Sequence, residues 1–343
     1  MTSLGSFNFA KHVYSYGRNS PVQRDSENDP FEFNSIAKFA TASSRRNADP
    51  WYSAFVEYHD DPNYADTIIR KTLDGTGKWG PKSTAQRSAV ITAMSSFHVL
   101  FLHLIAQIND AVNSCNGVDV DSEDEYDLTH PWDEVAALVI GSLEGGDEGG
   151  SSDTQDGQLI WGLGNQRAFE FQTLSKEGYA NVNSELEDYL FAGKGELDVL
   201  DCANLERTAN RIKNGVLVPL MQSTLRYAIE NEQLDSSSPS ANLALGEVYA
   251  LAIIPIIQTF DPASADILQQ NMVVESGIEV VREGSQAVAN ALGTAAIANG
   301  MGCEPIGFTS QADPCRNYGR NSSASTLRPL FSLAVIVGAW FIL

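Results

Sequence analysis

Apolar residues recur at helical spacing along most of the chain. Between residues 85 and 115 they return mostly at steps of three and four, which is typical of one face of an α-helix. Pro131 and the acids after it predict the start of another helix, because proline lacks a donor that the first turn does not need and acids suit the N-terminal dipole. We expect further helices over residues 159–173, 211–229 and 245–260.

Two later stretches resemble each other. WDEVAALVIGSLEGG (132–146) and LGEVYALAIIPIIQTF (245–260) each follow a long apolar helix, and their alignment places Glu247 on Glu134. Strand-like alternation and hairpin signals are not prominent. The sequence therefore predicts a mainly α fold, with two related helical bundles in one compact unit.

The same patterns suggest boundaries along the chain. Helical patterns begin near Ala65, and the residues before it are largely polar. We expect an extended polar segment over 1–50, a first helical half over 51–185, a second half over 186–300, a cysteine-bearing loop over 301–320 and an attachment segment over 321–343.

The charge of the chain limits its partners. It carries 44 acidic and 22 basic residues, a net charge of −22, and this excludes nucleic acid because phosphate binding depends on clusters of Lys and Arg. GxSxG, Walker and HExxH motifs are absent. GTGKWG (75–80) follows no strand pattern, and the acidic loop 119–127 has Asp124 where an EF-hand needs glycine. We expect no enzyme.

Four cysteines indicate an oxidising compartment. Cys303 and Cys315 flank a loop with two prolines and are expected to form a local disulfide. Cys115 and Cys202 would then form a long-range pair. No Cys or His spacing suits tetrahedral zinc.

The two ends of the chain bear on its location. Residues 329–343, PLFSLAVIVGAWFIL, are apolar but short for a membrane span, and small residues beginning at Ser322 precede them. These features predict a lipid (GPI) anchor attached at Ser322, with a membrane-spanning tail as the alternative. Asn321 begins the chain's one glycosylation sequon. The first twenty residues contain no run of signal-peptide length, so we expect an entry signal upstream of Met1.

The densest group of candidate metal ligands lies in EYHDDPNYADTIIR (57–70). Tyr58, His59 and Asp61 offer phenolate, imidazole and carboxylate donors, and a hard cation such as ferric iron favours anionic oxygen. The structural alternative is an ordinary surface turn before a helix, with its tyrosines packed on the edge.

Helical geometry limits what residues 132–146 do alone. Asp133 and Glu144 would lie about 20° apart around a helix but roughly 16 Å apart along it, too far for one ion. A site that uses Glu134 or Glu144 therefore needs a second helix. Arg87 and His98 share the eleven-residue spacing, so a buried Arg–carboxylate pair between two helices is a purely structural alternative. His98 and His103 are expected in the core.

Four separated blocks follow one another within residues 50–310. They are HPWDEVAALVIGSLEG, LIWGLGNQRAFEF, VPLMQSTLRYAI and GEVYALAIIPIIQTFDPASADILQQNM. In this order they resemble the algal iron-assimilation proteins, which include the phytotransferrins of diatoms and the periplasmic iron-deficiency proteins of green algae.

The resemblance implies a protein that binds ferric iron, Fe(III), at the outer face of the plasma membrane. Carbonate would act as a synergistic anion, and internalisation to an acidified endosome would release the iron. The chemistry of the side chains, rather than a transferred ligand set, selects the candidate iron ligands Tyr58, His59, Asp61, Glu134, Glu144, Tyr227 and Glu247. Arg87 and Arg167 are the candidate anion-binding residues.

The chain also departs from the family pattern. Ala168, Leu174 and Phe260 stand where relatives often have cysteine, and Gln166 replaces a basic residue beside Arg167. The competing interpretation is therefore a non-catalytic structural or adhesive surface protein that has lost metal binding.

Overall fold

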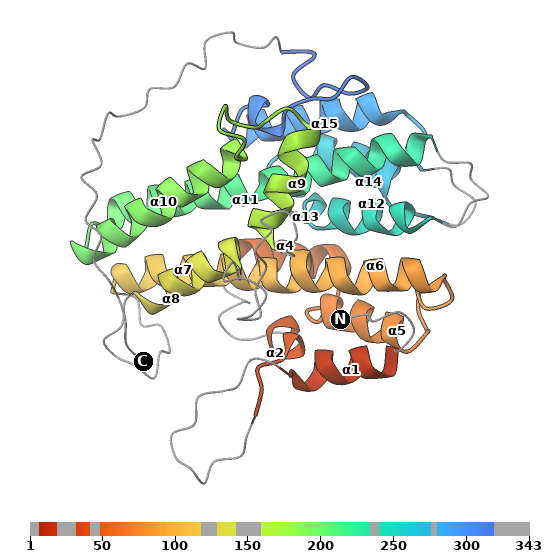
Figure 1. Cartoon of the computed structure of the whole chain (residues 1–343), viewed down its shortest axis with the longest axis horizontal. Coiled ribbons are helices and arrows are strands. Elements are labelled where there is room, and N and C mark those ends of the chain that lie inside the picture. Colours follow the sequence, from red (N-terminus) through yellow and green to blue (C-terminus); the bar gives the residue numbers. More distant parts are fainter. Residues whose placement is uncertain are drawn as a thin grey trace.

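The structure, a computed structural model, describes residues 7–18, 32–41, 49–117, 129–141, 159–233, 240–275 and 280–318. These residues form no strand, and an isolated bridge joins Leu174 to Ala180. The mainly α fold predicted from the sequence is confirmed. The helices are α1 (Phe7–Tyr16), α2 (Ile36–Ala40), α4 (Pro50–His59), α5 (Tyr64–Leu73), α6 (Thr84–Met94), η1 (Ser95–Leu100), α7 (Phe101–Cys115), α8 (His130–Ile140), α9 (Ile160–Glu170), α10 (Asn181–Asp198), α11 (Cys202–Glu232), α12 (Ala241–Leu251), α13 (Ile254–Gln258), α14 (Pro262–Met272), α15 (Ser285–Ala298) and η3 (Glu304–Ile306) (Figure 1).

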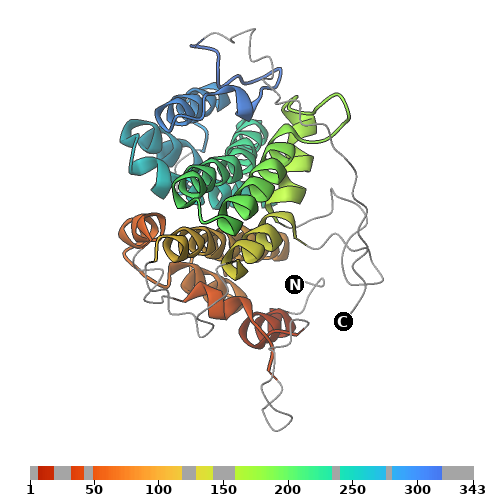
Figure 2. The ribbon, with the colours of Figure 1, turned by 90° about the vertical axis from the view of Figure 1, so that its left-hand side faces the viewer.

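One long helical rod, made of α6, η1 and α7, crosses the middle of the molecule (Figure 1). Helices α1, α2 and α5 lie on one side of the rod, and α10 to α15 lie on the other, an arrangement that Figure 2 shows from a second direction. α8 packs along α7, and α12 packs against both α6 and α11. The buried apolar side chains of the described residues form one continuous core.

The rod forms because its sequence is apolar and well capped. Ser83 and Gln86 form a capping box at its start. The rod contains a π-helical segment, η1, and π-helical turns are rare and often mark functional places. Thr84–Cys115 and Ala241–Gln258 are long and apolar enough to cross a membrane, but both are mostly buried here, as core helices are.

The N-terminal segment differs from the expectation of an extended chain. α1 and α2 form well before Ala65, where helical patterns were expected to begin. Tyr14 on α1 is fully buried and donates a 2.8 Å hydrogen bond to Asp66 of α5. A few apolar positions are enough for α1 and α2 to form, because tertiary packing supplies most of the stability of a short helix.

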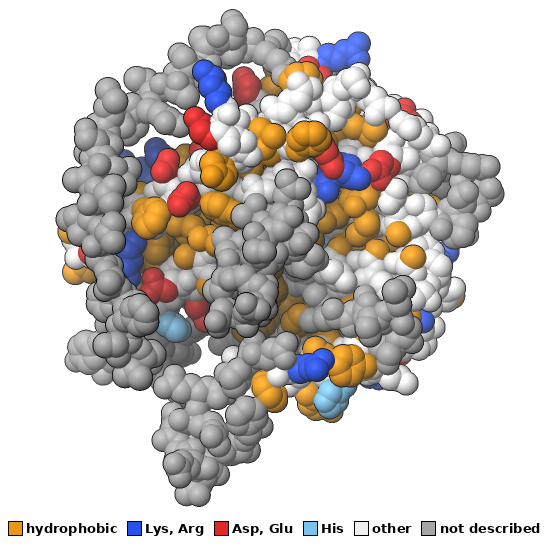
Figure 3. Space-filling view, viewed as in Figure 1, with side chains coloured by type: hydrophobic (Ala, Val, Ile, Leu, Met, Phe, Trp, Pro, Cys, Tyr) orange, Lys and Arg blue, Asp and Glu red, His pale blue; other side chains and the backbone are white. Residues whose placement is uncertain are grey.

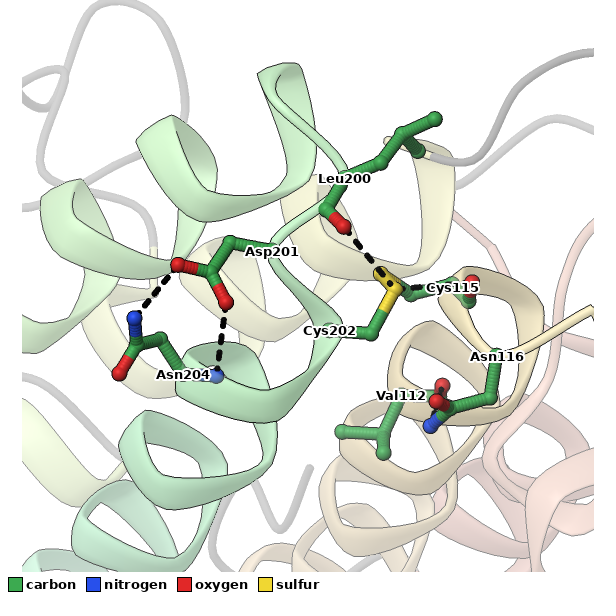
Figure 4. Close-up of a disulfide and its surroundings, with 7 residues drawn as sticks. All are labelled: Val112, Cys115, Asn116, Leu200, Asp201, Cys202 and Asn204. Atoms are coloured by element: carbon green, nitrogen blue, oxygen red, sulfur yellow. Dashed lines mark hydrogen bonds between the residues drawn. A yellow bond between two sulfur atoms is a disulfide. The ribbon is translucent and has the colours of Figure 1, made fainter.

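Both cysteine pairs that the sequence suggested are bonded in the structure. Cys115 and Cys202 join the end of α7 to the start of α11, with their Cα atoms 5.5 Å apart (Figure 4). Cys303 and Cys315 close a local loop, with Cα atoms 5.4 Å apart.

Some sequence predictions concern residues that the structure does not describe. Glu144, Asn321, Ser322 and the apolar tail 329–343 lie outside the described residues. The domain boundaries and the internal duplication stay predictions. The two aligned glutamates differ in their surroundings, since Glu247 is buried and the Glu134 side chain is about half-exposed.

Candidate functional site

The tyrosine-rich stretch is a helix end and a turn rather than one converging set of ligands. The Tyr58 hydroxyl donates a hydrogen bond to Gln269 Oε1 of α14. His59 lies flat on Tyr64, with ring centroids 4.1 Å apart, and its Nε2 is buried without a hydrogen-bond partner. Asp61 accepts hydrogen bonds from the amide of Asn63 and the hydroxyl of Thr67, both at 2.8 Å, so it stabilises the first turn of α5.

A buried hydrogen-bond chain connects this stretch to the π-helical segment. His98 Nε2 lies 2.9 Å from the carbonyl oxygen of Val248, and a carbonyl only accepts, so Nε2 carries the proton. His98 Nδ1 then accepts from the Tyr64 hydroxyl at 3.1 Å. Burial lowers the pKa of His98 to about 4, and burial together with His98 lowers the pKa of His59 to about 3.

These histidines predict loss of stability in acid. The unfolded chain binds a proton at His98 below about pH 6.5, whereas the folded chain resists it until about pH 4. Stability from this group is therefore present above pH 6.5 and is lost as the pH falls through about 4. We expect His98→Gln to reduce the fall in unfolding free energy between pH 7 and pH 4 by about 3 kcal/mol in urea titrations. The exposed His12→Gln is the control, and equal pH profiles for all three proteins would contradict this assignment.

Glu247 is buried and already neutralised. Its two oxygens lie 2.7 and 2.6 Å from Lys78 Nζ, and Oε2 also accepts the amide of Val274 at 2.8 Å. Burial raises the pKa of the Glu247 carboxyl, and Lys78 and the Val274 amide oppose that rise. An iron ion at Glu247 would have to displace the ammonium, so Glu247 is better explained as a structural ion pair.

Removal of the Lys78 ammonium should leave the buried Glu247 carboxylate without a counter-charge and so destabilise the fold. We expect Lys78→Met to lower the unfolding free energy by about 2 kcal/mol at pH 7, because Glu247 is left buried without its counter-charge while the partly exposed lysine is screened by water. The pKa of Glu247 then rises further, so the loss shrinks as the pH falls and the carboxyl is protonated. The exposed Lys82→Met is the matched control. A loss that stays constant from pH 7 to pH 4 would rule out the buried charge as its cause.

Glu134 lies near two imidazoles. Its Oε2 is 3.7 Å from His103 Nε2 of α7, and its Oε1 is 3.9 Å from His130 Nε2 one turn earlier on α8. The sequence predicts that any metal site at Glu134 needs a second helix. In the structure α7 takes this position, and it places His103 next to the carboxylate. Phe39 packs on the His103 ring at a centroid distance of 4.3 Å.

Arg87, one of the two candidate anion partners, caps a helix. Its Nε and Nη2 donate to the carbonyl oxygens of Thr72 and Leu73, each at 3.0 Å, at the end of α5. Its guanidinium also lies over the Phe7 ring of α1, 3.7 Å from the centroid. These contacts give it a role in packing α1 and α5 against α6.

Arg167 and Tyr227, in contrast, belong to one group. We call this group the tyrosine–arginine cluster; its members come from α9, α11 and α12 and are Arg167, Glu170, Arg226, Tyr227, Glu230 and Tyr249. On the face in Figure 3, acidic and basic side chains lie side by side near the places where Figure 1 labels α9 and α14.

Ion pairs organise the cluster. Glu170 joins two guanidiniums, because its Oε2 lies 2.8 Å from Arg167 Nη1 and its Oε1 accepts from Arg226 Nη1. Arg226 Nη2 also contacts Glu230 Oε1 at 2.7 Å. Arg167 is only 7% exposed, and its Nε is buried without a hydrogen-bond partner, as is the Nε of Arg226. Each guanidinium therefore keeps one donor that is buried and unpaired.

The two phenols lie beside these guanidiniums. The rings of Tyr227 and Tyr249 stack with centroids 5.5 Å apart and planes within 11°. Gly246 permits this approach, since a Cβ there would lie 2.7 Å from Asn231 Nδ2 and 3.2 Å from the Tyr227 Cβ. Burial raises the pKa of both phenols, and Arg167 and Arg226 lower it.

Sequence reasoning found only part of this cluster. It selected Arg167 and Tyr227 but missed Glu170, Arg226, Glu230 and Tyr249. Glu170 follows Arg167 by three residues on α9, a spacing that places both on one helix face. Tyr249 lies two residues after Glu247 and therefore on a different side of α12. The alignment of Glu247 with Glu134 thus gave no indication of Tyr249.

The carboxylates, imidazoles and sulfurs of the described residues offer one tight group of three or more. It consists of Cys303, Glu304 and Cys315, within 4.8 Å of one another, and both cysteines are consumed by their disulfide. Of this group, only the Glu304 carboxylate remains available to a metal ion.

The family of low iron-inducible periplasmic proteins (Fea1) matches residues 2–249 of the chain. The chain belongs to the Fea1 family. This membership confirms the resemblance to the iron-assimilation proteins and gives the chain a role in iron assimilation; the Fea1 family is not known as a family of enzymes. No curated protein and no solved structure matches the chain.

The Fea1 match covers the whole tyrosine–arginine cluster. It extends to residue 249, so it includes Arg167, Tyr227 and Tyr249 as well as the Lys78–Glu247 pair. It ends before α13, α14 and α15 and before the disulfide between Cys303 and Cys315. The features beyond residue 249 therefore lie outside the part of the chain that the Fea1 family matches.

Proposed function

We propose that the chain binds ferric iron, together with carbonate, for iron uptake at the cell surface, and that the tyrosine–arginine cluster is the site. The observation that carries the proposal is the stack of Tyr227 and Tyr249 beside Arg167 and Arg226. Phenolate oxygens suit Fe(III), and guanidinium groups suit the planar, doubly charged carbonate. Membership in the Fea1 family supports a role in iron assimilation.

Charge in the cluster fits this chemistry. Two guanidiniums balance two carboxylates, Glu170 and Glu230, while the phenols are protonated. Fe(III) brings three positive charges, carbonate removes two, and loss of both phenol protons removes two more, so the charge of the site changes little on loading. Glu170 already bridges Arg167 and Arg226 in the way that a bound anion would, and its partly exposed side chain leaves a path for carbonate to replace it.

Loading with iron should release protons. Because burial keeps Tyr227 and Tyr249 protonated in the iron-free protein, each phenolate that binds iron gives up one proton. Iron affinity should therefore decrease as the pH decreases, by up to about 100-fold per pH unit if both phenols bind iron. Competition with a chelator of known pH dependence, at about pH 7.5 and about pH 6.5, measures this slope. An affinity independent of pH would exclude phenolate ligands.

Attachment to the membrane completes the proposal. The apolar tail 329–343, or a lipid anchor at Ser322, would hold the chain on the outer face of the plasma membrane, and acidification after internalisation would release the iron. Family membership fits a location outside the cytosol, and the two disulfides fit an oxidising compartment.

One observation favours the alternative of a structural or adhesive protein. Glu170 and Glu230 already satisfy much of Arg226, and Lys78 neutralises Glu247, so the folded chain balances many of its buried charges without metal. Calorimetric titration with Fe(III) in bicarbonate buffer and in bicarbonate-free buffer separates the two. We expect binding that is much weaker without bicarbonate. No binding in either buffer, and no rise in melting temperature with any metal, would favour the structural alternative.

A further inference from the structure

Two histidines and one glutamate come together where α7 packs along α8. We call them the histidine–glutamate group; its members are His103, His130 and Glu134. His130 and Glu134 are four residues apart on α8, a spacing that places both on one face of the helix, and His103 approaches them from α7. The group shares no residue with the tyrosine–arginine cluster.

Packing holds two members of the group in place. Trp132, two residues before Glu134, is buried, and its Nε1 donates to the carbonyl oxygen of Leu190 at 2.9 Å, which ties α8 to α10. The His103 side chain is mostly buried, and its ring packs on Phe39. The fold therefore sets the positions of the Glu134 carboxylate and the His103 imidazole.

The distances within the group are close to those between neighbouring ligands of one metal ion. Glu134 Oε2 lies 3.7 Å from His103 Nε2, and Glu134 Oε1 lies 3.9 Å from His130 Nε2, so both contacts are longer than a hydrogen bond. Two ligands of a tetrahedral zinc ion, each about 2.0–2.1 Å from the metal, lie about 3.3 Å apart. An ion would need to draw each pair together by about half an ångström.

His130 is the member that must move. The two imidazoles face different oxygens of Glu134, so the three ligand atoms do not yet surround one point. The His130 side chain is 70% exposed at the first residue of α8, and that of Glu134 is 40% exposed. Figure 3 shows a histidine beside acidic side chains at the surface, near the place where Figure 1 labels α8. Rotation of the exposed His130 ring toward Oε2 brings the three ligands together, and solvent reaches the site.

We propose that the histidine–glutamate group binds a divalent transition-metal ion. His103 and His130 supply two imidazole nitrogens, Glu134 supplies a carboxylate oxygen, and water fills the remaining positions. This ligand set suits zinc or ferrous iron, whereas calcium and magnesium prefer oxygen ligands alone. The net charge of −22 also draws cations toward the chain. The site is separate from the proposed ferric site and does not depend on it.

Calorimetric titration of the full oxidised, iron-free chain with zinc chloride tests the proposal, with calcium chloride and magnesium chloride as comparisons. We expect zinc to bind at micromolar concentrations and to raise the melting temperature, while calcium and magnesium bind far more weakly. No zinc binding below millimolar concentrations, or calcium binding as tight as that of zinc, would overturn the proposal. Glu134→Gln should leave Fe(III) binding in bicarbonate unchanged, and loss of Fe(III) binding in this variant would overturn a separate site.

Two variants locate the zinc ion. Glu134→Gln and His130→Gln each remove one ligand; loss of a residue that merely orients a ligand already costs about 10–100-fold in metal affinity, so each should weaken zinc binding by at least about tenfold. Asp133→Asn is the matched control, because it removes the same charge from the adjacent position, where Asp133 lies 3.5 Å from Lys194. It should leave zinc affinity unchanged.

Melting temperatures without metal show whether the variants fold. If Glu134→Gln fails to fold, His130→Gln, a change at an exposed side chain, decides. A folded variant of either kind that binds zinc as tightly as Asp133→Asn does would contradict the assignment.

Discussion

Replacement of both tyrosines of the cluster, Tyr227→Phe and Tyr249→Phe, is expected to abolish tight binding of ferric iron. Each phenylalanine keeps the stacked ring but removes the only atom that would contact the metal. A hydrogen bond to a charged group is worth about 1.5–3 kcal/mol, and we expect a phenolate bond to Fe(III) to be worth no less, so each single change should weaken binding by at least about tenfold. Competition with citrate, followed by the change in protein fluorescence, measures the loss.

The matched control is Tyr179→Phe, at an exposed tyrosine after α9. It should leave iron affinity unchanged. Arg167→Gln adds a second readout, because loss of an anion-binding guanidinium should weaken iron binding in bicarbonate far more than in bicarbonate-free buffer. If the double phenylalanine variant folds and binds iron as tightly as the natural sequence, the tyrosine–arginine cluster is not the site.

Loss of the disulfide between Cys115 and Cys202 is expected to destabilise the fold by roughly 4–5 kcal/mol, because it frees a loop of 87 residues in the unfolded chain. The pair between Cys303 and Cys315 closes only 12 residues, so its removal should cost about 3 kcal/mol. Urea unfolding of Cys115→Ala/Cys202→Ala and of Cys303→Ala/Cys315→Ala, without reductant, gives both values.

The two variants serve as controls for each other. Each double variant should respond to reductant only through its remaining disulfide, so the fully reduced natural sequence should be less stable than either. A larger loss from the local pair than from the long-range pair would contradict the loop-length argument.

Periodic apolar residues predicted the rod, α8, α9, α11 and α12, but not α10, α14 or α15. The stretch 85–115 became the rod of α6, η1 and α7, and Pro131 lies in the first turn of α8 as expected. The pattern could not show the π-helical segment, since a local change in hydrogen bonding leaves apolar spacing almost the same. It also missed the break between α12 and α13, where Pro255 opens a new helix within an unbroken apolar run.

The candidate site was only partly predictable, for a geometric reason. Spacing shows which residues share a face of one helix, but not which helix faces them. Glu134 and Glu247 align in sequence, yet one lies near His103 and the other pairs with Lys78. Arg167 and Tyr227 were selected by chemistry alone, and only the packing of α9, α11 and α12 shows that they lie close to Tyr249.

Alternative roles for the tyrosine-rich stretch also follow from packing. Asp61 is used by the first turn of α5, and His59 and Tyr64 stack on each other. Burial raises the pKa of Tyr58 to about 12, and its hydroxyl donates a hydrogen bond to Gln269. The structural interpretation of this stretch, as a turn with packed aromatic rings, accounts for these contacts without a metal.

The visible absorption spectrum of the iron-loaded full chain in bicarbonate buffer tests the central claim most directly. Phenolate bound to Fe(III) gives a charge-transfer band, whereas carboxylate and imidazole ligands alone do not. We predict a band that appears in proportion to added iron and disappears in the variant with Tyr227→Phe and Tyr249→Phe. Iron bound tightly without such a band, or a band that the double variant retains, would contradict a ferric site at the tyrosine–arginine cluster.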